Sequence, residues 1–352
     1  ASNTKKQCVW SPGGAVALAP LTPRNMLKGT PCALPRDYTP VTPTTPASGY
    51  AGGLLPGIKV LGAFLGEDEW CSEQLCKRVR TALEPLKGIV QLQDAPNLDT
   101  AQQAQQSLLR FCSNQTLVYF LRTMPPSVTI DAARLHDSLI EEAFHRIVSS
   151  QAGSSSQQAQ AVRQARLPVR LGGMGLTSME AIRGAAWVGT WALVWTPLRA
   201  LHEPFRTVDL TRESAAGFEQ LPIFLELQAA HASLMARYEH VAAAYERYDR
   251  QVYDFCKEGL AHYRFHPDCL PERETLLPLA AFDSGREHLQ NAQRRFSQIV
   301  HHAAWLSFWT GLMAEGAPRR EAVRFIAASQ PHAGDVLNAI PMRREFRVPS
   351  CF

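Results

Sequence analysis

Hydrophobic residues recur at helical spacing through most of the chain. From Ala132 to Val148 they follow steps of three and four residues, which places them on one face of an amphipathic helix. The same pattern predicts further helices over residues 69–86, 101–112, 117–124, 158–165, 178–195, 221–262, 284–314 and 318–329. The sequence therefore predicts a mainly α protein whose longest helices lie in its C-terminal half.

Capping and stop signals separate the predicted helices. Asp99–Thr100 is expected to cap the helix that follows it, and Ser178 is expected to cap another. Pro125–Pro126 is expected to stop one helix, and Thr129 to cap the next. Residues 149–158 are rich in serine, glutamine and glycine, so we expect a flexible linker there.

The N-terminal part of the chain has a different pattern. Residues 1–56 are rich in proline, glycine and threonine, which favours an extended arm that lies on another surface, with a short strand at residues 7–10. Glycines bracket apolar residues from Gly57 to Gly66, which predicts a β-hairpin. We expect the arm to be followed by two helical domains, over residues 57–150 and 151–352.

A glycine-rich segment, Leu167–Leu176, lies between the two helical regions, and we call it the connector. Gly172, Gly173 and Gly175 permit positive φ angles or close backbone approach, and Pro168 fixes one φ angle. Leucine and methionine keep the segment apolar, so we expect a turn that is packed against the protein. By itself this pattern indicates a structural turn between domains.

Composition and charge permit a nucleic-acid partner without requiring one. The chain has 352 residues, of which 45% are hydrophobic, and a net charge of +4. Each basic cluster alone is more often a solvated helix face, but together they make contact with an RNA or DNA backbone plausible. These clusters are Lys77, Arg78 and Arg80; Arg163, Arg166 and Arg170; Arg294–Arg295; Arg319–Arg320; and Arg343–Arg344.

Catalytic and metal-binding signals are weak. The sequence contains no Walker loop, G-x-S-x-G elbow, H-E-x-x-H motif or Rossmann fingerprint. Two cysteines and two histidines have a spacing that zinc could use, but an ordinary helix end is the alternative, and no metal is expected. These residues are Cys256, His262, His266 and Cys269. The irregular spacing of the cysteines favours a reducing intracellular compartment. An organellar assembly, considered below, would place the chain in a mitochondrion. No apolar run reaches the length of a transmembrane helix.

Several segments, in order along the chain, resemble the reverse transcriptases of non-LTR retrotransposons. The connector is the best match, because it follows the pattern L-P-x-R-x-G-G-x-G-L. Ile58–Gly66 resembles the primer-grip hairpin of that family. The remaining similar segments are Asn3–Lys6, Trp10–Pro12, Ser107–Cys112, Leu121–Pro126 and Ala333–Pro341.

The resemblance implies a thumb-like helical bundle after the hairpin, followed by the connector and a second bundle of long helices. It also implies nucleic-acid contacts at Lys5 or Lys6, Arg110 and Arg122. The family's catalytic palm carries an aspartate pair, but no Y-x-D-D sequence occurs in this chain. Two-metal polymerisation needs such carboxylates to hold its ions. We therefore expect no polymerase activity from this chain alone, and no cofactor.

Three functional hypotheses follow. The first is a non-catalytic, retroelement-derived subunit that associates with RNA or acts as a scaffold in a larger assembly, such as an organellar ribosome. The second is the C-terminal half of an active reverse transcriptase that needs its palm in trans. The third is a structural protein–protein interaction module that binds no nucleic acid. Salt-dependent RNA binding distinguishes the first from the third.

Overall fold

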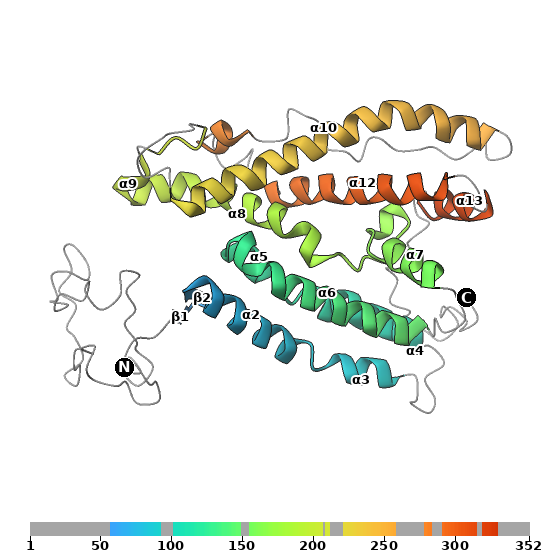
Figure 1. Ribbon diagram of the computed structural model, residues 1–352, viewed down its shortest axis with the longest axis horizontal. Helices are drawn as coiled ribbons and strands as arrows, with labels where there is room; N and C mark the ends of the chain where they lie inside the picture. The colour runs from blue at the N-terminus through green and yellow to red at the C-terminus, as the bar shows by residue number, and fades with distance from the viewer. Residues whose placement is uncertain are drawn as a thin grey trace. The chain divides into compact units, whose positions relative to one another are not determined.

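Figure 1 shows the computed structural model of the chain. It describes residues 57–92, 101–148, 155–206, 208–211, 221–257, 278–283, 291–314 and 319–329. The predicted arm over residues 1–56, including Lys5 and Lys6, lies outside these residues, as does the capping signal at Asp99–Thr100. The chain divides into two compact units, Ala1–Leu75 and Cys76–Phe352.

A β-hairpin begins the described part of the first unit. Strand β1 (Gly57–Val60) pairs antiparallel with β2 (Ala63–Gly66). Leu61 and Gly62, which join the strands, have φ angles of 49° and 97°. Positive φ at both central residues is the requirement of a type I′ hairpin turn, which matches the twist of the two strands. The predicted hairpin is confirmed.

Helices make up most of the remaining described chain, which confirms the predicted mainly α fold. Helix α2 (Asp68–Ala82) follows the hairpin. The first helices after it are α3 (Leu86–Gln91), α4 (Ala101–Leu108), a π-helical turn (Leu109–Ser113), α5 (Val118–Thr123) and α6 (Pro126–Val148). Around and after the connector lie α7 (Ser155–Ala165), a 3-10 turn (Val169–Leu171), α8 (Met179–Leu201) and α9 (Glu203–Arg206). The last elements are α10 (Pro222–Lys257), a 3-10 turn (Leu279–Asp283), α12 (Ala292–Leu312) and α13 (Arg319–Ala328).

Several predicted helix boundaries are wrong. The helix expected over residues 69–86 is α2, which ends earlier, at Ala82; a turn at residues 83–85 follows it, and the next helix, α3, was not predicted. Thr129 does not cap α6, because the helix already begins at Pro126, whose fixed φ and missing N–H suit a first helical position. The Thr129 hydroxyl instead donates to the Pro125 carbonyl at 3.2 Å.

Two other helices are longer than expected. Helix α7 begins at Ser155, so residues 155–158 are helical and do not belong to the predicted linker. Helix α8 continues past Trp195 to Leu201, with Pro197 inside it. The predicted cap of α8 is confirmed, because the Ser178 hydroxyl accepts a hydrogen bond from the Ala181 N–H at 3.1 Å.

Helix α8 is the centre of the second unit. It packs against α10 and α12 on one side and against α5 and α6 on the other (Figure 1). Its sequence is apolar on all faces, and a helix of that kind is stable when neighbours cover it. At the crossing with α12, a Cβ atom on Gly189 would lie 2.5 Å from the Gln293 Cα. Glycine at this position therefore permits the close approach of the two helices.

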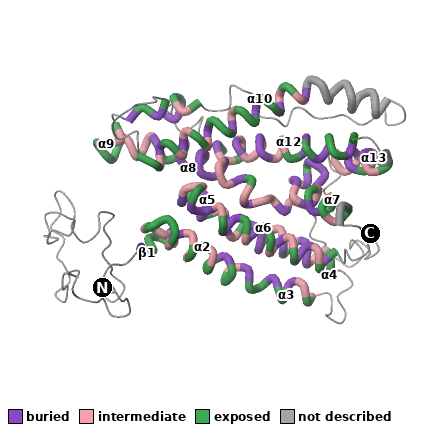
Figure 2. Tube along the Cα trace, in the orientation of Figure 1, coloured by how far each residue is buried: buried purple, intermediate pink, exposed green. Residues whose placement is uncertain are grey.

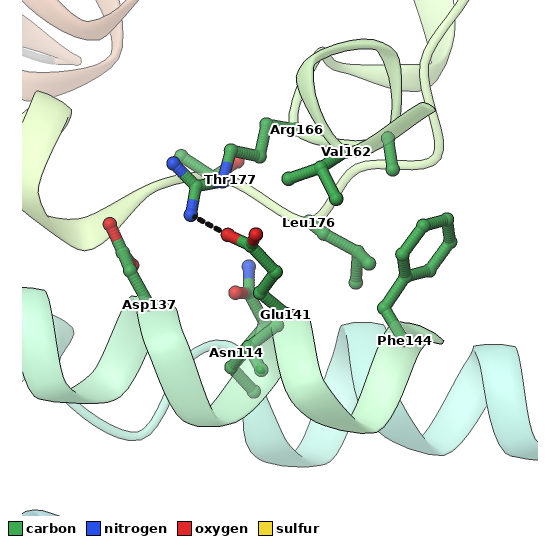
Figure 3. Close-up of a pocket in the computed structure, with 10 residues that line it drawn as sticks. Asn114, Asp137, Glu141, Phe144, Val162, Arg166, Leu176 and Thr177 are labelled. Carbon is green, nitrogen blue, oxygen red and sulfur yellow. Dashed lines mark hydrogen bonds and ion pairs between the residues drawn. The ribbon is translucent and has the colours of Figure 1, made fainter. Parts of the chain in front are cut away.

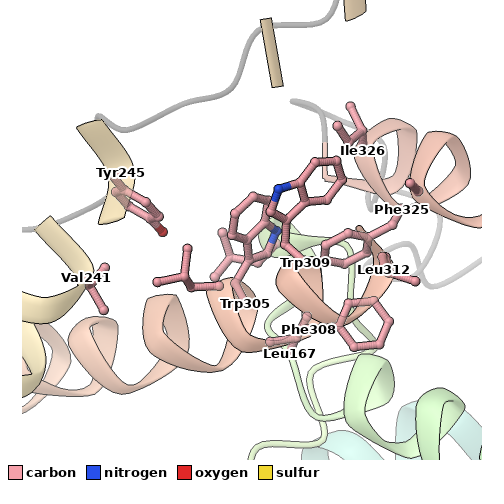
Figure 4. Packing of buried hydrophobic residues seen from close by; sticks show 12 residues of the cluster. Leu167, Val241, Tyr245, Trp305, Phe308, Trp309, Leu312, Phe325 and Ile326 are labelled. Carbon is pink, nitrogen blue, oxygen red and sulfur yellow. The ribbon is translucent and has the colours of Figure 1, made fainter. Parts of the chain in front are cut away.

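A second core lies between α10, α12, α13 and the connector (Figure 4). Trp305 and Trp309 stack with ring centroids 6.0 Å apart and an interplanar angle of 11°. Leu167 and Leu171 of the connector are buried in the same cluster. The burial colouring along α12 and the connector shows this core as purple segments (Figure 2). The connector is thus anchored by the C-terminal helices.

Candidate functional site

The connector folds back on the end of α7 as a compact turn. The N–H of Gly173 donates to the Pro168 carbonyl at 3.1 Å, and the N–H of Gly175 donates to the Leu167 carbonyl at 2.8 Å. The N–H groups of Met174 and Leu176 both donate to the Ala165 carbonyl, at 3.2 and 3.1 Å. These bonds satisfy the backbone of a segment whose only regular element is the 3-10 turn Val169–Leu171, so its path is fixed.

Each connector glycine meets a different neighbour. Gly172 has a φ of +80°, and a Cβ atom there would lie 2.6 Å from the Ser329 hydroxyl. A Cβ on Gly173 would lie 2.1 Å from the Leu167 carbonyl oxygen. Gly175 has a φ of +76°, and a Cβ there would lie 2.5 Å from the Nε of Arg110. The glycines therefore allow the turn to touch α13, the end of α7 and the π-helical turn.

On the other side of the connector, Asp137 of α6 caps the N-terminus of α8. Its carboxylate accepts hydrogen bonds from the Ser178 hydroxyl at 2.5 Å, the Met179 N–H at 2.8 Å and the Glu180 N–H at 3.2 Å. The first N–H groups of a helix have no partner within the helix, and a carboxylate there also interacts favourably with the helix dipole. Asp137 thus joins two helices through one buried charge.

The pKa of Asp137 lies below its ordinary value. Burial acts to raise it, but the neighbouring His136 ring, the hydrogen bonds from the Ser178 hydroxyl and the Met179 N–H, and the charge of Arg166 together outweigh burial and lower the pKa. His136 itself is fully buried, and its Nδ1 lies 3.6 Å from the Asp137 Oδ1. The carboxylate is therefore charged at neutral pH and holds α8 in place.

A small pocket lies beside this cap (Figure 3). Arg166 crosses it and donates from Nη2 to the Glu141 Oε2 at 2.8 Å. The remaining volume is about 10 Å³, which is room for about one water molecule. Phe144, Val162 and Leu176 give the pocket an apolar wall. It is too small to hold a substrate, so we treat the Arg166–Glu141 pair as a structural link.

The basic residues near the connector have different environments. Arg166 is half-buried in its ion pair with Glu141, whereas Arg163 and Arg170 are exposed. Arg170 lies near His301 of α12. Burial, together with the charge of Arg170, lowers the pKa of His301 to about 4, so that histidine is neutral at physiological pH. Of the three arginines at positions 163, 166 and 170, Arg163 and Arg170 are therefore the two whose side chains are exposed to solvent.

Arg110 is also brought to the connector, although it lies far from it in the sequence. Its guanidinium packs against Gly175 and lies over the Phe111 ring, with the Cζ atom 4.7 Å from the ring centroid. Burial lowers the pKa of Arg110 from its ordinary value. Arg110 is thus held between the connector and an aromatic ring.

The other predicted contact residues lie elsewhere. Arg122 of α5 donates from Nε to the Gln293 Oε1 at 2.5 Å, which ties α5 to α12. Lys77, Arg78 and Arg80 are exposed on α2, away from the connector in sequence and on a different element. The exposed Arg320 shares Glu321 with Arg324.

The four residues with a spacing that zinc could use fall largely outside the described residues. His262, His266 and Cys269 are not described, and neither is the side chain of Cys256. The pair Arg343–Arg344 also lies outside. Among the residues that the structure describes, no group of three or more His, Cys, Asp or Glu side chains is placed to hold a metal ion. No helix in the described ranges is long and apolar enough to cross a membrane.

Two contributors to this region were not expected from the sequence. Asp137 lies in the middle of an amphipathic helix, where an acidic residue carries no local signal of a remote capping role. Phe111 falls in a stretch predicted as ordinary helix, and the π-helical turn that exposes it has no recognised sequence pattern here. Comparison of the chain with known protein families, curated proteins and solved structures finds no match.

Proposed function

We propose that this chain is a non-catalytic subunit of a larger assembly, derived from a retroelement reverse transcriptase, and that it holds RNA at the connector. The observation that carries the proposal is the exposure of Arg163, near the end of α7, and of Arg170, on the connector, whose backbone is fixed by hydrogen bonds and buried leucines. Arginine suits phosphate because its planar guanidinium donates two parallel hydrogen bonds. A rigid support reduces the entropy lost when such contacts form.

The distribution of ion pairs around the connector supports this assignment. Arg166 is paired with Glu141, and Arg134 is paired with Glu180 at 2.9 Å. No ion pair within the described part of the chain involves Arg163 or Arg170. Charges left without an acidic partner are the ones that attract a polyanion over a distance of about one Debye length.

The proposed lack of catalysis rests on the sequence. A polymerase active site of the resembled family needs an aspartate pair, and the chain contains no Y-x-D-D sequence. A subunit that keeps the thumb-like helices of such an enzyme also keeps the surfaces that contact a nucleic-acid backbone. The proposal therefore assigns binding to this chain and assigns no chemical step.

The proposal also includes a protein partner. Leu193 and Val194 of α8 are 47% and 40% exposed, and Leu201 at the end of the same helix is 77% exposed. Exposed apolar residues grouped on one element are typical of protein interaction surfaces. A subunit with RNA on the connector and protein on the end of α8 fits a ribonucleoprotein assembly, such as an organellar ribosome.

Reversing both charges should weaken RNA binding. We expect the double substitution Arg163→Glu and Arg170→Glu to lower the affinity for single-stranded RNA at least tenfold, because two phosphate contacts are replaced by repulsion. The slope of log K against log salt concentration should fall in magnitude by about 1.4, since each contact with single-stranded nucleic acid contributes about 0.7. Fluorescence anisotropy of a labelled oligonucleotide over a salt series measures both quantities.

A double variant with the same change in net charge provides the control. Arg146→Glu and Arg324→Glu alter exposed arginines that form ion pairs on α6 and α13. We expect this control to change affinity much less and to leave the salt slope near that of the unmodified protein. Equal losses in both double variants would assign the binding to net charge and contradict the proposed site.

A further inference from the structure

The end of α8 carries a stripe of exposed aliphatic side chains. Leu193, Val194 and Leu201 are 47%, 40% and 77% exposed, and we call these three residues the α8 stripe. Positions seven and eight residues apart lie on one face of a helix, so the three side chains line the same side of the last turns of α8. At a rise of about 1.5 Å per residue, the α8 stripe is about 12 Å long, which matches about two turns of a second helix laid against it.

A cation is held at the C-terminal end of the α8 stripe. Arg206 of α9 donates from Nε to the Arg199 carbonyl and from Nη2 to the Ala200 carbonyl, both at 3.2 Å. Ala200 directly precedes Leu201 in the chain, so these bonds place the guanidinium beside the most exposed leucine of the stripe. The acceptors are uncharged carbonyl groups, so the positive charge of Arg206 is not neutralised by them.

A second cation, Arg122 of α5, lies near the other end of the α8 stripe. Its Nε donates to the Gln293 Oε1 at 2.5 Å, and the Gln293 backbone lies directly against Gly189 of α8. Gly189 precedes Leu193 by four residues, which is about one helical turn along the same face. Arg122 and Arg206 are both exposed, and within the described part of the chain neither forms an ion pair. The α8 stripe is therefore an apolar surface flanked by positive charge.

We propose that the α8 stripe binds an amphipathic helix of a partner protein whose apolar face is bordered by aspartate or glutamate. This inference rests on the protein partner in the proposed function and assigns the chemistry of that partner. Apolar residues at helical spacing on the partner cover the stripe, as in other complexes in which a helix is bound by its apolar face. Acidic residues near the two ends of that face meet Arg122 and Arg206, which fixes the orientation of the bound helix.

Charge and side-chain type favour this occupant over two others. RNA would pair with the arginines, but leucine and valine have no aromatic face on which a base could stack. A second copy of this chain, joined through the same face, would bring its own Arg122 and Arg206 to the interface, where like charges oppose association. An acidic amphipathic helix removes the aliphatic surface from water and also supplies the guanidinium groups with carboxylates, which pair with arginine through parallel hydrogen bonds.

The test uses two labelled helical peptides that share one leucine face, which glutamate borders in the first peptide and lysine in the second. We expect the full chain to bind the glutamate peptide about tenfold more tightly, and added salt to reduce this preference by screening the flanking charges. Leu201→Asp should weaken binding of the glutamate peptide about tenfold, because it places a charge in the apolar contact. Val148→Asp, which alters a 44% exposed side chain at the end of α6, is the matched control and should have little effect. Fluorescence anisotropy measures each affinity.

A charge swap excludes loss of folding as the cause of weaker binding. Arg122→Glu together with Arg206→Glu should reverse the preference, so that the lysine peptide binds more tightly than the glutamate peptide. An unfolded variant would lose both peptides and could not gain affinity for either. If the unmodified chain bound neither peptide, or bound both equally, the inference would be overturned.

The outcomes separate this inference from the function on which it rests. If the peptides do not bind while Arg163→Glu with Arg170→Glu weakens RNA binding, the inference is wrong and RNA at the connector stands. If the glutamate peptide binds as expected and the unmodified chain binds no RNA, the RNA-binding function is wrong and the α8 stripe stands. Loss of RNA affinity in Leu201→Asp would assign the stripe to RNA, and loss of a dimer in that variant would assign it to a second copy. Either result would overturn the inference.

Discussion

Replacing Gly173 with alanine should lower the free energy of unfolding by more than about 3 kcal/mol, or prevent folding. The added Cβ would lie 2.1 Å from the Leu167 carbonyl oxygen and 2.6 Å from the Gln164 carbonyl oxygen. Both neighbours are backbone atoms that rotamer changes do not move. The end of α7 and the turn would have to separate, which would also disturb the burial of Leu167 and Leu171. Urea denaturation followed by far-UV circular dichroism measures the change.

A second glycine gives a control of opposite sign. Gly311 lies inside α12, and a Cβ there would have nothing within 4 Å. Gly311→Ala should therefore raise the free energy of unfolding by about 0.5–1 kcal/mol, because alanine loses less backbone entropy in a helix. If Gly173→Ala were as stable as Gly311→Ala, the described path of the connector would be wrong.

Substitution of Asp137 should also destabilise the fold. In Asp137→Ala the Ser178 hydroxyl and the N–H groups of Met179 and Glu180 lose their common acceptor. Loss of a helix cap together with buried unpaired donors should cost about 2–4 kcal/mol at neutral pH. Asp131→Ala, an exposed acidic residue on the same helix, should change stability by less than about 0.5 kcal/mol. Chemical denaturation of the two variants makes the comparison.

The Asp137 contribution should depend on pH in one direction. Its pKa is lower in the folded protein than its ordinary value, so the folded state favours the charged form. The stability that this charge contributes is complete above the ordinary aspartate pKa and is lost as pH falls through the lowered folded value. Asp137→Asn should therefore be less stable than the unmodified protein at neutral pH and approach its stability in acid. A constant difference at all pH values would contradict the described cap.

Local patterns in the sequence were sufficient for the helices whose apolar stripe is regular. The stripe from Ala132 to Val148 identified most of α6, and the serine at position 178 identified the start of α8. The sequence contains two signals for the start of α6: Pro126, which suits a first helical position, and Thr129, which suits a cap. The helix begins at Pro126, so the predicted first turn was misplaced. Helix α8 continues past its last tryptophan because packing with neighbouring helices outweighs a proline near its end.

The candidate site could be predicted only in part, because its members come from separate elements. The connector glycines and the three arginines at positions 163, 166 and 170 are close together in the sequence, so their grouping was visible. The contact between Arg110 and Gly175, and the reach of Asp137 to α8, depend on tertiary packing that no local pattern encodes. The pairing of Arg166 with Glu141 likewise divides the three arginines in and just before the connector into one structural residue, Arg166, and two exposed cations, Arg163 and Arg170.

Ultraviolet crosslinking of the full chain to single-stranded RNA, followed by mass-spectrometric mapping of the linked peptides, measures most directly where RNA lies. The proposed interface predicts adducts in peptides from residues 163–176, and their loss in the variant with Arg163→Glu and Arg170→Glu. Adducts confined to α10 or α13, or unchanged by that variant, would contradict an RNA interface at the connector.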